Sequence, residues 1–361
     1  MSQTHVSLRS SSGPRVAVRR EGGRTLRILC YHRVADPART PGLDPSLVSA
    51  TPTTFRSQML HLSRHYRVVT LDEVLAAFRG GRLLPHRAVL LTFDDAYRDF
   101  ADEAWPVLRD LDLPATLFVP TAYPGRPDRA FWWDRLHRIM DNRNGSDRGE
   151  VSRRDRPRQP AARNFRARLK GLSHQEAVAM VDRLEASWEP PPASSSGPSV
   201  VLDWDELREL GREGVSLGAH TRWHSALTRA TEEAIREELR GSLEDLRSQV
   251  EDVPIVISYP YGLHDDRTIR IAREEGFDLG FTCLGGLNRV GRTDPLRLRR
   301  TTVSLRTTPL LFRLRMLPWF ATLDRWRHGV KATLSPGSRL SPEEILRALA
   351  SAVSFPVPQP R

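Results

Sequence analysis

The chain has 361 residues, of which 39% are hydrophobic, and this is enough for one large α/β domain with a substantial core. Its formal net charge of +11 comes almost wholly from arginine, because Lys170 and Lys331 are the only lysines. The mean hydropathy of -0.45 and the lack of any run of about 18 apolar residues argue against a membrane span. No basic stripe is interleaved with aromatic residues, so no nucleic acid partner is expected.

The N-terminal residues and the cysteines bear on the compartment of the protein. Residues 1–25 are polar, contain arginine and have no apolar core, so we expect a flexible leader without a recognisable secretion signal. Cys30 and Cys283 are too few for a disulfide framework and lack metal-site spacing, which suits a reducing compartment. The expected location is the cytoplasm, with export or peripheral membrane contact as alternatives.

From Leu26 onward, short apolar runs alternate with amphipathic segments of helical length. The apolar runs predict buried strands at residues 26–31, 88–93, 115–119, 215–219, 255–259 and 279–282. Strands that alternate with helices in this way predict a parallel sheet, either open or closed into a barrel.

Helix signals lie between these strands. Residues 70–73 form a capping box that opens a helix running towards Phe78. Thr231 can cap a long helix over residues 232–250, which has apolar residues on one face. A further helix is expected over residues 174–188.

Two polar segments and the C-terminal part differ from this pattern. Residues 141–165, crowded with Arg, Asp, Asn and Gly, and the Pro/Ser-rich residues 189–199 are expected to be surface loops or insertions. Residues 304–361 are expected to form a C-terminal helical extension. Within it, residues 310–330 mix large apolar residues with arginines and could pack on the barrel or lie on a membrane surface.

Two consecutive carboxylates end one predicted strand. Asp94 and Asp95 directly follow residues 88–93. In parallel α/β folds the carboxyl ends of strands are where sites are built, so this pair is a candidate functional feature. Taken alone, an Asp-Asp pair is more often a solvated turn or a helix cap.

Two histidines follow another predicted strand. His220 and His224 come just after residues 215–219, and they share one face if the backbone turns helically there. With Asp95 they complete a set of two histidines and one carboxylate, which leaves positions open for water and substrate. Asp94 can then take the proton as water attacks a carbonyl group. A histidine pair with this spacing is also often structural.

Three segments resemble, in order and spacing, the motifs of the polysaccharide deacetylases, the NodB-homology domains of carbohydrate esterase family 4. They are residues 91–95 (Leu-Thr-Phe-Asp-Asp), 220–224 (His-Thr-Arg-Trp-His) and 258–262 (Ser-Tyr-Pro-Tyr-Gly). The lead-in at residues 202–207 is similar to that family as well, and the resemblance covers residues 26–303.

The resemblance implies an α/β fold, a distorted (β/α)7 TIM-like barrel of the NodB-homology type. It also implies a divalent metal, usually Zn²⁺, and hydrolysis of N-acetyl groups on an amino-sugar polysaccharide, oligosaccharide or glycan precursor. An N-acetylated glycan is therefore the expected substrate. The sequence does not indicate an oligomeric state.

Roles in this reaction are implied residue by residue. By resemblance, Asp94 is the catalytic base, and the metal ligands are Asp95, His220 and His224. Tyr261, after Pro260, is similar to the residue whose backbone N–H forms the oxyanion hole; a donor there would act on charge that appears only in the tetrahedral intermediate.

The sequence departs from the family pattern at several points. Ala96 stands where a glycine is common, so the turn is not expected to use a positive φ. No arginine precedes Pro260 to orient the base, which leaves Arg300 as a candidate for this role or for an internal ion pair.

The general acid of the family is also missing from its usual C-terminal motif. In the subgroup that deacetylates biofilm exopolysaccharide, the barrel order is permuted and the acid histidine lies in an N-terminal Tyr-His motif. Residues 29–34 (Leu-Cys-Tyr-His-Arg-Val) resemble this arrangement and imply that His32 is the acid. The alternative is a histidine that is only hydrogen-bonded at a strand end.

The remaining alternatives concern substrate and activity. Trp132 and Trp133 could stack on sugar rings or belong to the core. The same metal site could hydrolyse acetyl esters or non-sugar amides. A catalytically idle glycan-binding barrel is a further alternative, although it would not need the full set of Asp94, His32 and the three ligands.

Overall fold

The computed structural model describes residues 25–40, 42–126, 128–146, 166, 169, 170, 172–186, 200–317 and 320. The strands are β1 (Thr25–Tyr31), β2 (Arg33–Val34), β3 (Val48–Ala50), β4 (Arg67–Val68), β5 (Ala88–Asp94), β6 (Thr116–Val119), β7 (Ser216–Ala219), β8 (Val256–Ser258), β9 (Leu279–Phe281), β10 (Asn288–Arg289) and β11 (Thr301–Thr302). The helices are α1 (Pro52–His65), α2 (Leu71–Phe78), α3 (Trp105–Asp110), α4 (Trp132–Ser146), α6 (His174–Ala186), α7 (Trp204–Arg212), α8 (Glu232–Gln249), α9 (Asp266–Glu274) and α10 (Pro309–Arg315).

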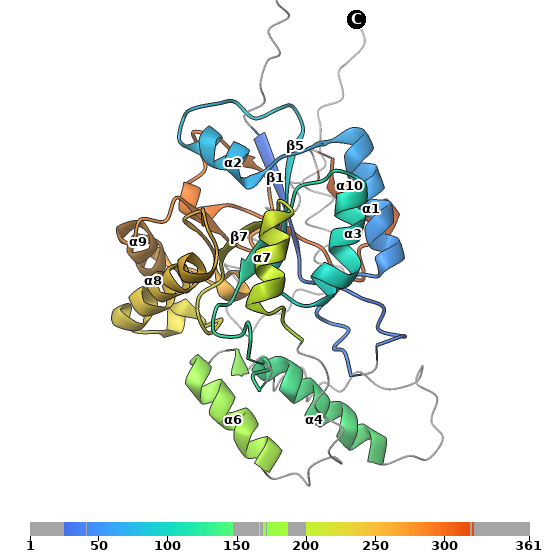
Figure 1. The fold of residues 1–361 in the computed structure, drawn as a ribbon, viewed down its shortest axis with the longest axis vertical. Coiled ribbons are helices and arrows are strands. Elements are labelled where there is room, and N and C mark those ends of the chain that lie inside the picture. The colour runs from blue at the N-terminus through green and yellow to red at the C-terminus, as the bar shows by residue number, and fades with distance from the viewer. Residues whose placement is uncertain are drawn as a thin grey trace, which may run out of the picture.

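A parallel sheet in the order β1-β5-β6-β7-β8-β9 forms the centre of the molecule, and helices surround it (Figure 1). All six strands predicted from the apolar runs are confirmed to within one residue at each end. Strands covered on both faces need apolar side chains on both, and all seven residues of β5 are buried. The continuous apolar runs in the sequence follow from this double burial.

The sheet closes through an irregular segment, residues 298–302. Leu298 bridges Phe281 at the end of β9, while Thr301 pairs with Leu29 on β1. This segment therefore joins the two edges of the curled sheet and occupies the seventh strand position. The arrangement agrees with the expected distorted (β/α)7 barrel.

The interior of the barrel changes character from one end to the other. Side chains two apart share one face of a strand, so Leu26, Ile28 and Cys30 on β1 form one inward series. The first two belong to an apolar cluster that fills the amino end of the barrel, and Leu90 of β5 belongs to the same cluster. Farther along the same face of β5 lies Asp94, so the carboxyl end of the barrel is polar and buried.

Most expected helices are confirmed. Thr70 and Glu73 form the predicted capping box of α2, and Thr231 caps α8 through the N–H of Ala234. Helix α6 begins at His174, as expected, and ends two residues before the predicted position.

The loop or insertion expected at residues 141–165 begins within a helix, because α4 continues to Ser146. The reason is an apolar stripe at helical spacing, Trp132, Leu136 and Ile139, which is buried and anchors the first turns of α4. Residues 147–165 and 189–199 lie outside the described residues. Helices α4 and α6 pack together at one end of the molecule (Figure 1), where Arg135 bonds Glu185 at 3.0 Å.

The described start of the C-terminal extension packs on the barrel. Phe312 and Met316 are buried, and the Met316 carbonyl accepts hydrogen bonds from Arg27 at 3.2 Å and Tyr66 at 3.0 Å. Most of residues 318–361, like residues 1–24, lies outside the described residues. Among the helices that the structure describes, none has the length and apolarity needed to cross a membrane.

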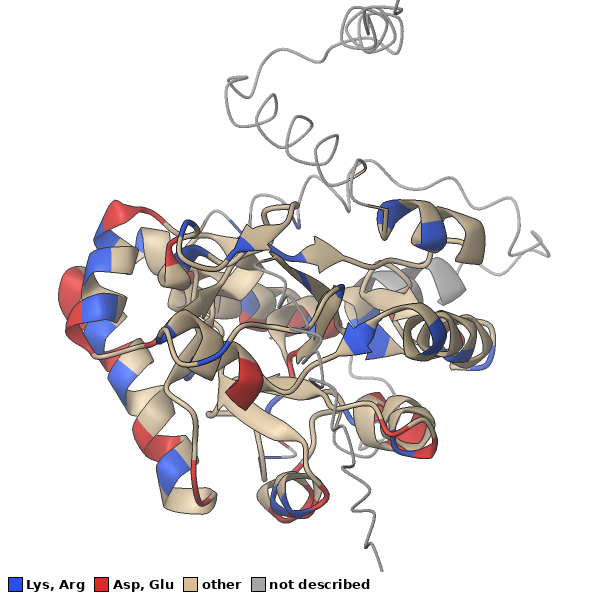
Figure 2. Cartoon of the chain, turned by 90° about the horizontal axis from the view of Figure 1, so that it is seen from above, with Lys and Arg blue, Asp and Glu red and all other residues tan. Residues whose placement is uncertain are grey.

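Basic and acidic residues alternate along the outer helices (Figure 2). Between α8 and α9, Arg240 bonds Glu275 at 2.9 Å and Arg236 bonds the same carboxylate at 3.0 Å. Some of the arginine side chains thus form ion pairs with carboxylates, and this face carries mixed charge rather than a basic stripe.

Candidate active site

Asp94, the last residue of β5, is a buried carboxylate held from several sides. Arg300 donates to Oδ1 and to Oδ2, both at 2.7 Å. Ser258 donates to Oδ2 at 3.2 Å, and the Cys30 thiol lies 3.6 Å from the same oxygen. Burial alone would raise the pKa of Asp94, but Arg300 and then His220 lower it to about 2. The carboxylate is therefore ionised and fixed in orientation.

Arg300 is a fully buried cation on the segment that closes the barrel. Besides its two bonds to Asp94, it donates to the Thr282 carbonyl at 2.9 Å and to the Ser258 hydroxyl at 2.9 Å. Burial lowers the pKa of Arg300, but Asp94 raises it well above its ordinary value. The two alternatives left open for Arg300 thus coincide, because its internal ion pair is made with the candidate base.

Asp95 and the two histidines form a second buried group beside Asp94. His220 Nε2 and His224 Nε2 lie 3.4 Å and 3.3 Å from Asp95 Oδ1, and the three ligand atoms lie within 4.8 Å of one another. Asp95 Oδ1 has no hydrogen-bond partner among the described residues. The His220 Nδ1 bonds the Ser258 carbonyl at 2.7 Å, which directs its Nε2 towards Asp95.

This donor set fits a divalent cation. A buried carboxylate oxygen without a partner is costly unless a cation compensates it. Burial raises the pKa of Asp95, but its contacts with His220 and His224 hold it well below the ordinary value. The pKa of His224 is lowered chiefly by burial, which favours the neutral imidazole that metals bind.

The loop that carries the histidines is not a helical turn, so the two side chains do not converge through a shared helix face. Thr221 and His224 have positive φ values of 61° and 56°, and the loop is fastened to α8 instead. Glu238 accepts the N–H of Arg222 at 2.9 Å and that of Trp223 at 3.0 Å. These bonds explain how two histidines four residues apart converge without a helix.

Sequence reasoning missed Glu238. It lies on the buried face of α8 with Ile235 and Ser242, and it also accepts a bond from Ser225 at 2.6 Å. A carboxylate on the apolar face of an amphipathic helix was a signal that could have found it.

Backbone strain is concentrated at the site. Of the eight described non-glycine residues with positive φ, five lie here: Asp95, Ala96, Thr221, His224 and Tyr261. The expectation that Ala96 would avoid a positive φ is wrong, since its φ is 51°. Each such residue costs about 1–3 kcal/mol, and the surrounding packing must hold it, as the full burial of Ala96 shows.

Aromatic rings enclose His224. The ring centroids of Tyr261 and Trp133 lie 4.6 Å and 4.7 Å from that of His224, both edge to face. Trp132 and Trp133 are only 2% and 4% exposed, so both belong to the core and offer no free face for a sugar. Trp133 donates to the Tyr97 hydroxyl at 2.8 Å, which fixes the indole against the histidine.

Tyr261 lies in the short turn Pro260–Gly262 after β8, with a φ of 59°. Pro260, which begins the turn, is buried. Gly262 also has a positive φ, 69°, and a Cβ there would meet the Cys283 backbone nitrogen at 2.5 Å. The turn therefore depends on glycine at this position, and it keeps Tyr261 beside His224.

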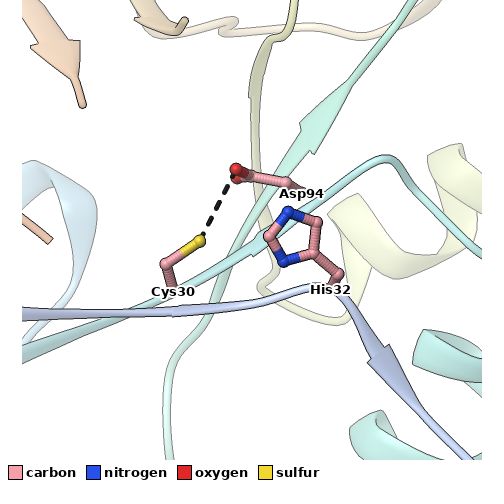
Figure 3. A group of neighbouring side chains, drawn as sticks. All are labelled: Cys30, His32 and Asp94. Atoms are coloured by element: carbon pink, nitrogen blue, oxygen red, sulfur yellow. Dashed lines mark hydrogen bonds between the residues drawn. The ribbon is translucent and has the colours of Figure 1, made fainter. Parts of the chain in front are cut away.

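His32 lies between β1 and β2, close to Asp94. Its side chain, Cys30 Sγ and an Asp94 oxygen lie within 4.8 Å of one another, as Figure 3 shows. The His32 backbone N–H donates to Ser49 Oγ at 2.9 Å. Because Arg300 already occupies both Asp94 oxygens, a cation placed among these three side chains would be repelled, so they fit a metal poorly.

The fold and the donor set define a barrel with a candidate metal centre at the carboxyl ends of its strands. A family model described as polysaccharide deacetylase matches residues 82–280, more than half of the chain. The chain belongs to the polysaccharide deacetylase family.

Curated relatives include the poly-beta-1,6-N-acetyl-D-glucosamine N-deacetylase of Escherichia coli strain K12, which is 26% identical over 269 residues, 74% of this chain and 35% of that protein. The enzyme of the same name from Staphylococcus aureus is 23% identical over 65% of this chain and 61% of its own length. The chain therefore spans less than two thirds of the length of either relative.

Solved structures show the same fold. The deacetylase PplD of Streptococcus pyogenes, in complex with acetate, superposes with a TM-score of 0.56 at 21% identity, covering 81% of this chain and 99% of that one. IcaB from Ammonifex degensii gives a TM-score of 0.53 at 21% identity, covering 82% and 99%.

Proposed function

We propose that this protein is a metal-dependent hydrolase that removes N-acetyl groups from an amino-sugar glycan and releases acetate. The proposal rests on the contrast between two adjacent carboxylates. Asp94 is ionised and fixed by hydrogen bonds, whereas Asp95 faces two histidines and its Oδ1 has no hydrogen-bond partner among the described residues. The names of the curated relatives favour poly-N-acetylglucosamine, or an oligosaccharide or precursor of it, as the substrate.

We assign Asp95, His220 and His224 as the residues that would hold the metal, and Zn²⁺ fits them best. Two imidazole nitrogens and one carboxylate oxygen are the ligands of many catalytic zinc sites. Ligands of tetrahedral zinc lie roughly 3.4 Å apart, and the two N–O distances here are 3.4 Å and 3.3 Å. When bound, zinc supplies Lewis acidity towards a carbonyl and makes water nucleophilic near neutral pH.

Asp94 acts as the general base in this proposal. It accepts the proton of the water that attacks the acetamide carbonyl, and its lowered pKa keeps it in the accepting, ionised form. Arg300 and Ser258 prevent the carboxylate from rotating, so its orientation is set before substrate binds.

His32 and Tyr261 complete the proposed machinery. The His32 imidazole, beside Asp94, donates the proton that the leaving amine needs. The Tyr261 backbone N–H, in the turn begun by Pro260, stabilises the negative charge that develops on the carbonyl oxygen.

We also propose a domain organisation. The deacetylase barrel spans residues 26–303, with polar insertions at 141–165 and 189–199, and the family match to residues 82–280 lies within it. Residues 1–25 form a leader and residues 304–361 a C-terminal extension.

Acetate release from N-acetylglucosamine oligomers tests this function. The protein is stripped with a chelator, reloaded with Zn²⁺ and assayed beside Asp94→Asn and His32→Ala. We expect zinc-dependent release that both substitutions abolish. His86→Ala is the matched control, since His86 is exposed near the amino end of β5 and should keep full activity.

The outcomes separate the parts of the proposal. No release, with Zn²⁺ bound stoichiometrically, would reject the amino-sugar substrate and direct the search to acetyl esters such as acetylated xylan. No zinc binding at all would reject the metal site and with it the function.

A further inference from the structure

Both cysteines of the chain lie at the candidate base. Cys30 Sγ is 3.6 Å from Asp94 Oδ2, and Arg300 Nη2 is 3.7 Å from Cys283 Sγ. These two contacts flank the 2.7 Å bond that joins Arg300 to Asp94. The two thiols also lie close enough for each to shift the pKa of the other. The sequence holds only these two cysteines, and the fold brings them together from opposite ends of the barrel domain.

Closure of the barrel explains this meeting. Cys30 lies on β1 opposite Thr302, and Cys283 follows β9, whose last residue is Phe281. Residues 298–302 lie between these two strands. Cys30 and Cys283 therefore meet beside the side chain of Arg300, and their proximity depends on the closed sheet.

The two thiols are not equivalent. Cys30 is completely buried, whereas Cys283 is partly exposed. The neighbouring Cys283 thiol and then burial raise the pKa of Cys30 well above its ordinary value. The neighbouring Cys30 thiol and the charge of Arg300 together outweigh burial and lower the pKa of Cys283 to about 5. Cys283 is therefore the accessible nucleophile, and Cys30 is a protonated thiol behind it.

We propose that Cys30 and Cys283 form a redox modification site that reacts with a hydroperoxide and closes a reversible disulfide beside the catalytic base. The disulfide itself does not depend on the deacetylase assignment. Its effect on catalysis rests on the proposed function, because it acts through Asp94 and Arg300.

The chemistry balances in two steps. The Cys283 thiolate attacks one peroxide oxygen, the O–O bond breaks, and the departing alkoxide or hydroxide takes up a proton, which leaves a sulfenic acid on Cys283. The Cys30 sulfur then attacks Cys283 Sγ, the S–O bond breaks, and the hydroxyl group leaves as water with the Cys30 proton. Two thiols lose two electrons in all, and the peroxide gains them.

Closure of the disulfide must disturb the base. Two bonded sulfurs lie about 2.05 Å apart, so the two side chains have to turn away from Asp94 and Arg300 towards each other. The thiol contact to Asp94 and the thiolate contact to Arg300 are lost at the same time. We expect acetate release to fall by at least about tenfold, a change of about 1.4 kcal/mol in the barrier.

Mass spectrometry tests the disulfide without any substrate. The full-length, zinc-loaded protein is reduced, freed of reductant and treated with stoichiometric hydrogen peroxide, then alkylated and digested. We expect a Cys30–Cys283 linked peptide that dithiothreitol removes. In Cys30→Ser, Cys283 should be trapped as a sulfenic acid by dimedone, while in Cys283→Ser the buried Cys30 should stay reduced.

Activity measured on the same samples tests the consequence. Wild-type acetate release should fall with disulfide formation and return with dithiothreitol, and Cys283→Ser should keep its own untreated rate after peroxide. No linked peptide in the wild type, or oxidation of Cys30 in Cys283→Ser, would overturn the site. A disulfide that leaves acetate release unchanged would overturn its effect on the base. If the disulfide forms in a protein that deacetylates nothing, the proposed function fails and the redox site stands.

Discussion

Two neighbouring aspartates at the end of β5 lie in opposite environments. Both Asp94 oxygens are engaged by Arg300, with Ser258 and Cys30 close by. Asp95 Oδ1 faces two imidazoles and has no hydrogen-bond partner among the described residues. The protein itself thus compensates the charge of Asp94, whereas the surroundings of Asp95 are suited to a bound cation.

The difference follows from the cost of burying charge. An ion pair with good geometry compensates the desolvation of both its members, as Arg300 does for Asp94. An unpaired buried carboxylate is tolerated only where something else compensates it, and the fold accepts strained backbone at Asp95 and His224 to build that position.

Exchanging the two aspartates for asparagine should separate catalysis from metal binding. Asp94→Asn removes the base and should lower kcat by roughly 10²–10⁴-fold while zinc still binds. Asp95→Asn removes a ligand and should weaken zinc binding as well as activity. Acetate release and zinc calorimetry on both variants measure the two effects. Equal loss of zinc by both would show that the division is wrong.

Breaking the buried ion pair should destabilise the barrel. Arg300→Met leaves the Asp94 charge uncompensated and should lower the free energy of unfolding by about 3–5 kcal/mol in urea. The double variant Asp94→Asn, Arg300→Met should recover part of this loss because no lone charge remains. Arg297→Met is the control: this arginine is on the surface, and its loss should matter by less than about 1 kcal/mol. If the stability losses of the two single variants simply add up in the double variant, the pairing is contradicted.

Asp134, a buried carboxyl group near the proposed metal ligands, should make the stability of the protein depend on pH. Burial raises the pKa of Asp134 from 3.8 to about 6, despite the Tyr97 hydroxyl that donates to it at 3.0 Å. The pKa of Asp134 is higher in the folded state than in the unfolded state. Its protonated carboxyl group therefore contributes fully to the free energy of unfolding below about pH 4, and this contribution is lost as pH rises to about 6. Asp134→Asn should therefore gain up to about 3 kcal/mol relative to wild type over this range. Urea unfolding at several pH values measures it, and a pH-independent difference would refute it.

Loosening the histidine loop should have the smallest effect. Glu238→Gln keeps one oxygen but weakens the acceptor that holds Arg222 and Trp223, and zinc affinity should fall by about tenfold. Competition with a chromophoric chelator measures the dissociation constant. Glu237→Gln, whose side chain is exposed, should leave it unchanged. Equal effects of both substitutions would argue against the role of Glu238.

The positions of the strands and most residues of the candidate active site could be predicted from the sequence. Continuous apolar runs marked strands buried on both faces, since few other structures bury every side chain of a short segment. Asp94, Asp95, His220 and His224 could be found because each lies at or just after the end of such a strand, and the ends of parallel strands meet at one rim of the barrel.

Other features were decided only by the tertiary structure. Glu238 holds the histidine loop from a different helix, and left-handed backbone at Thr221 and Ala96 is set by packing that no local pattern reveals. Cys30 and Cys283 looked unrelated, because their contact exists only once residues 298–302 close the barrel. Local patterns report the short-range preferences of the chain, whereas these contacts arise from closure of the sheet, which joins residues far apart in sequence.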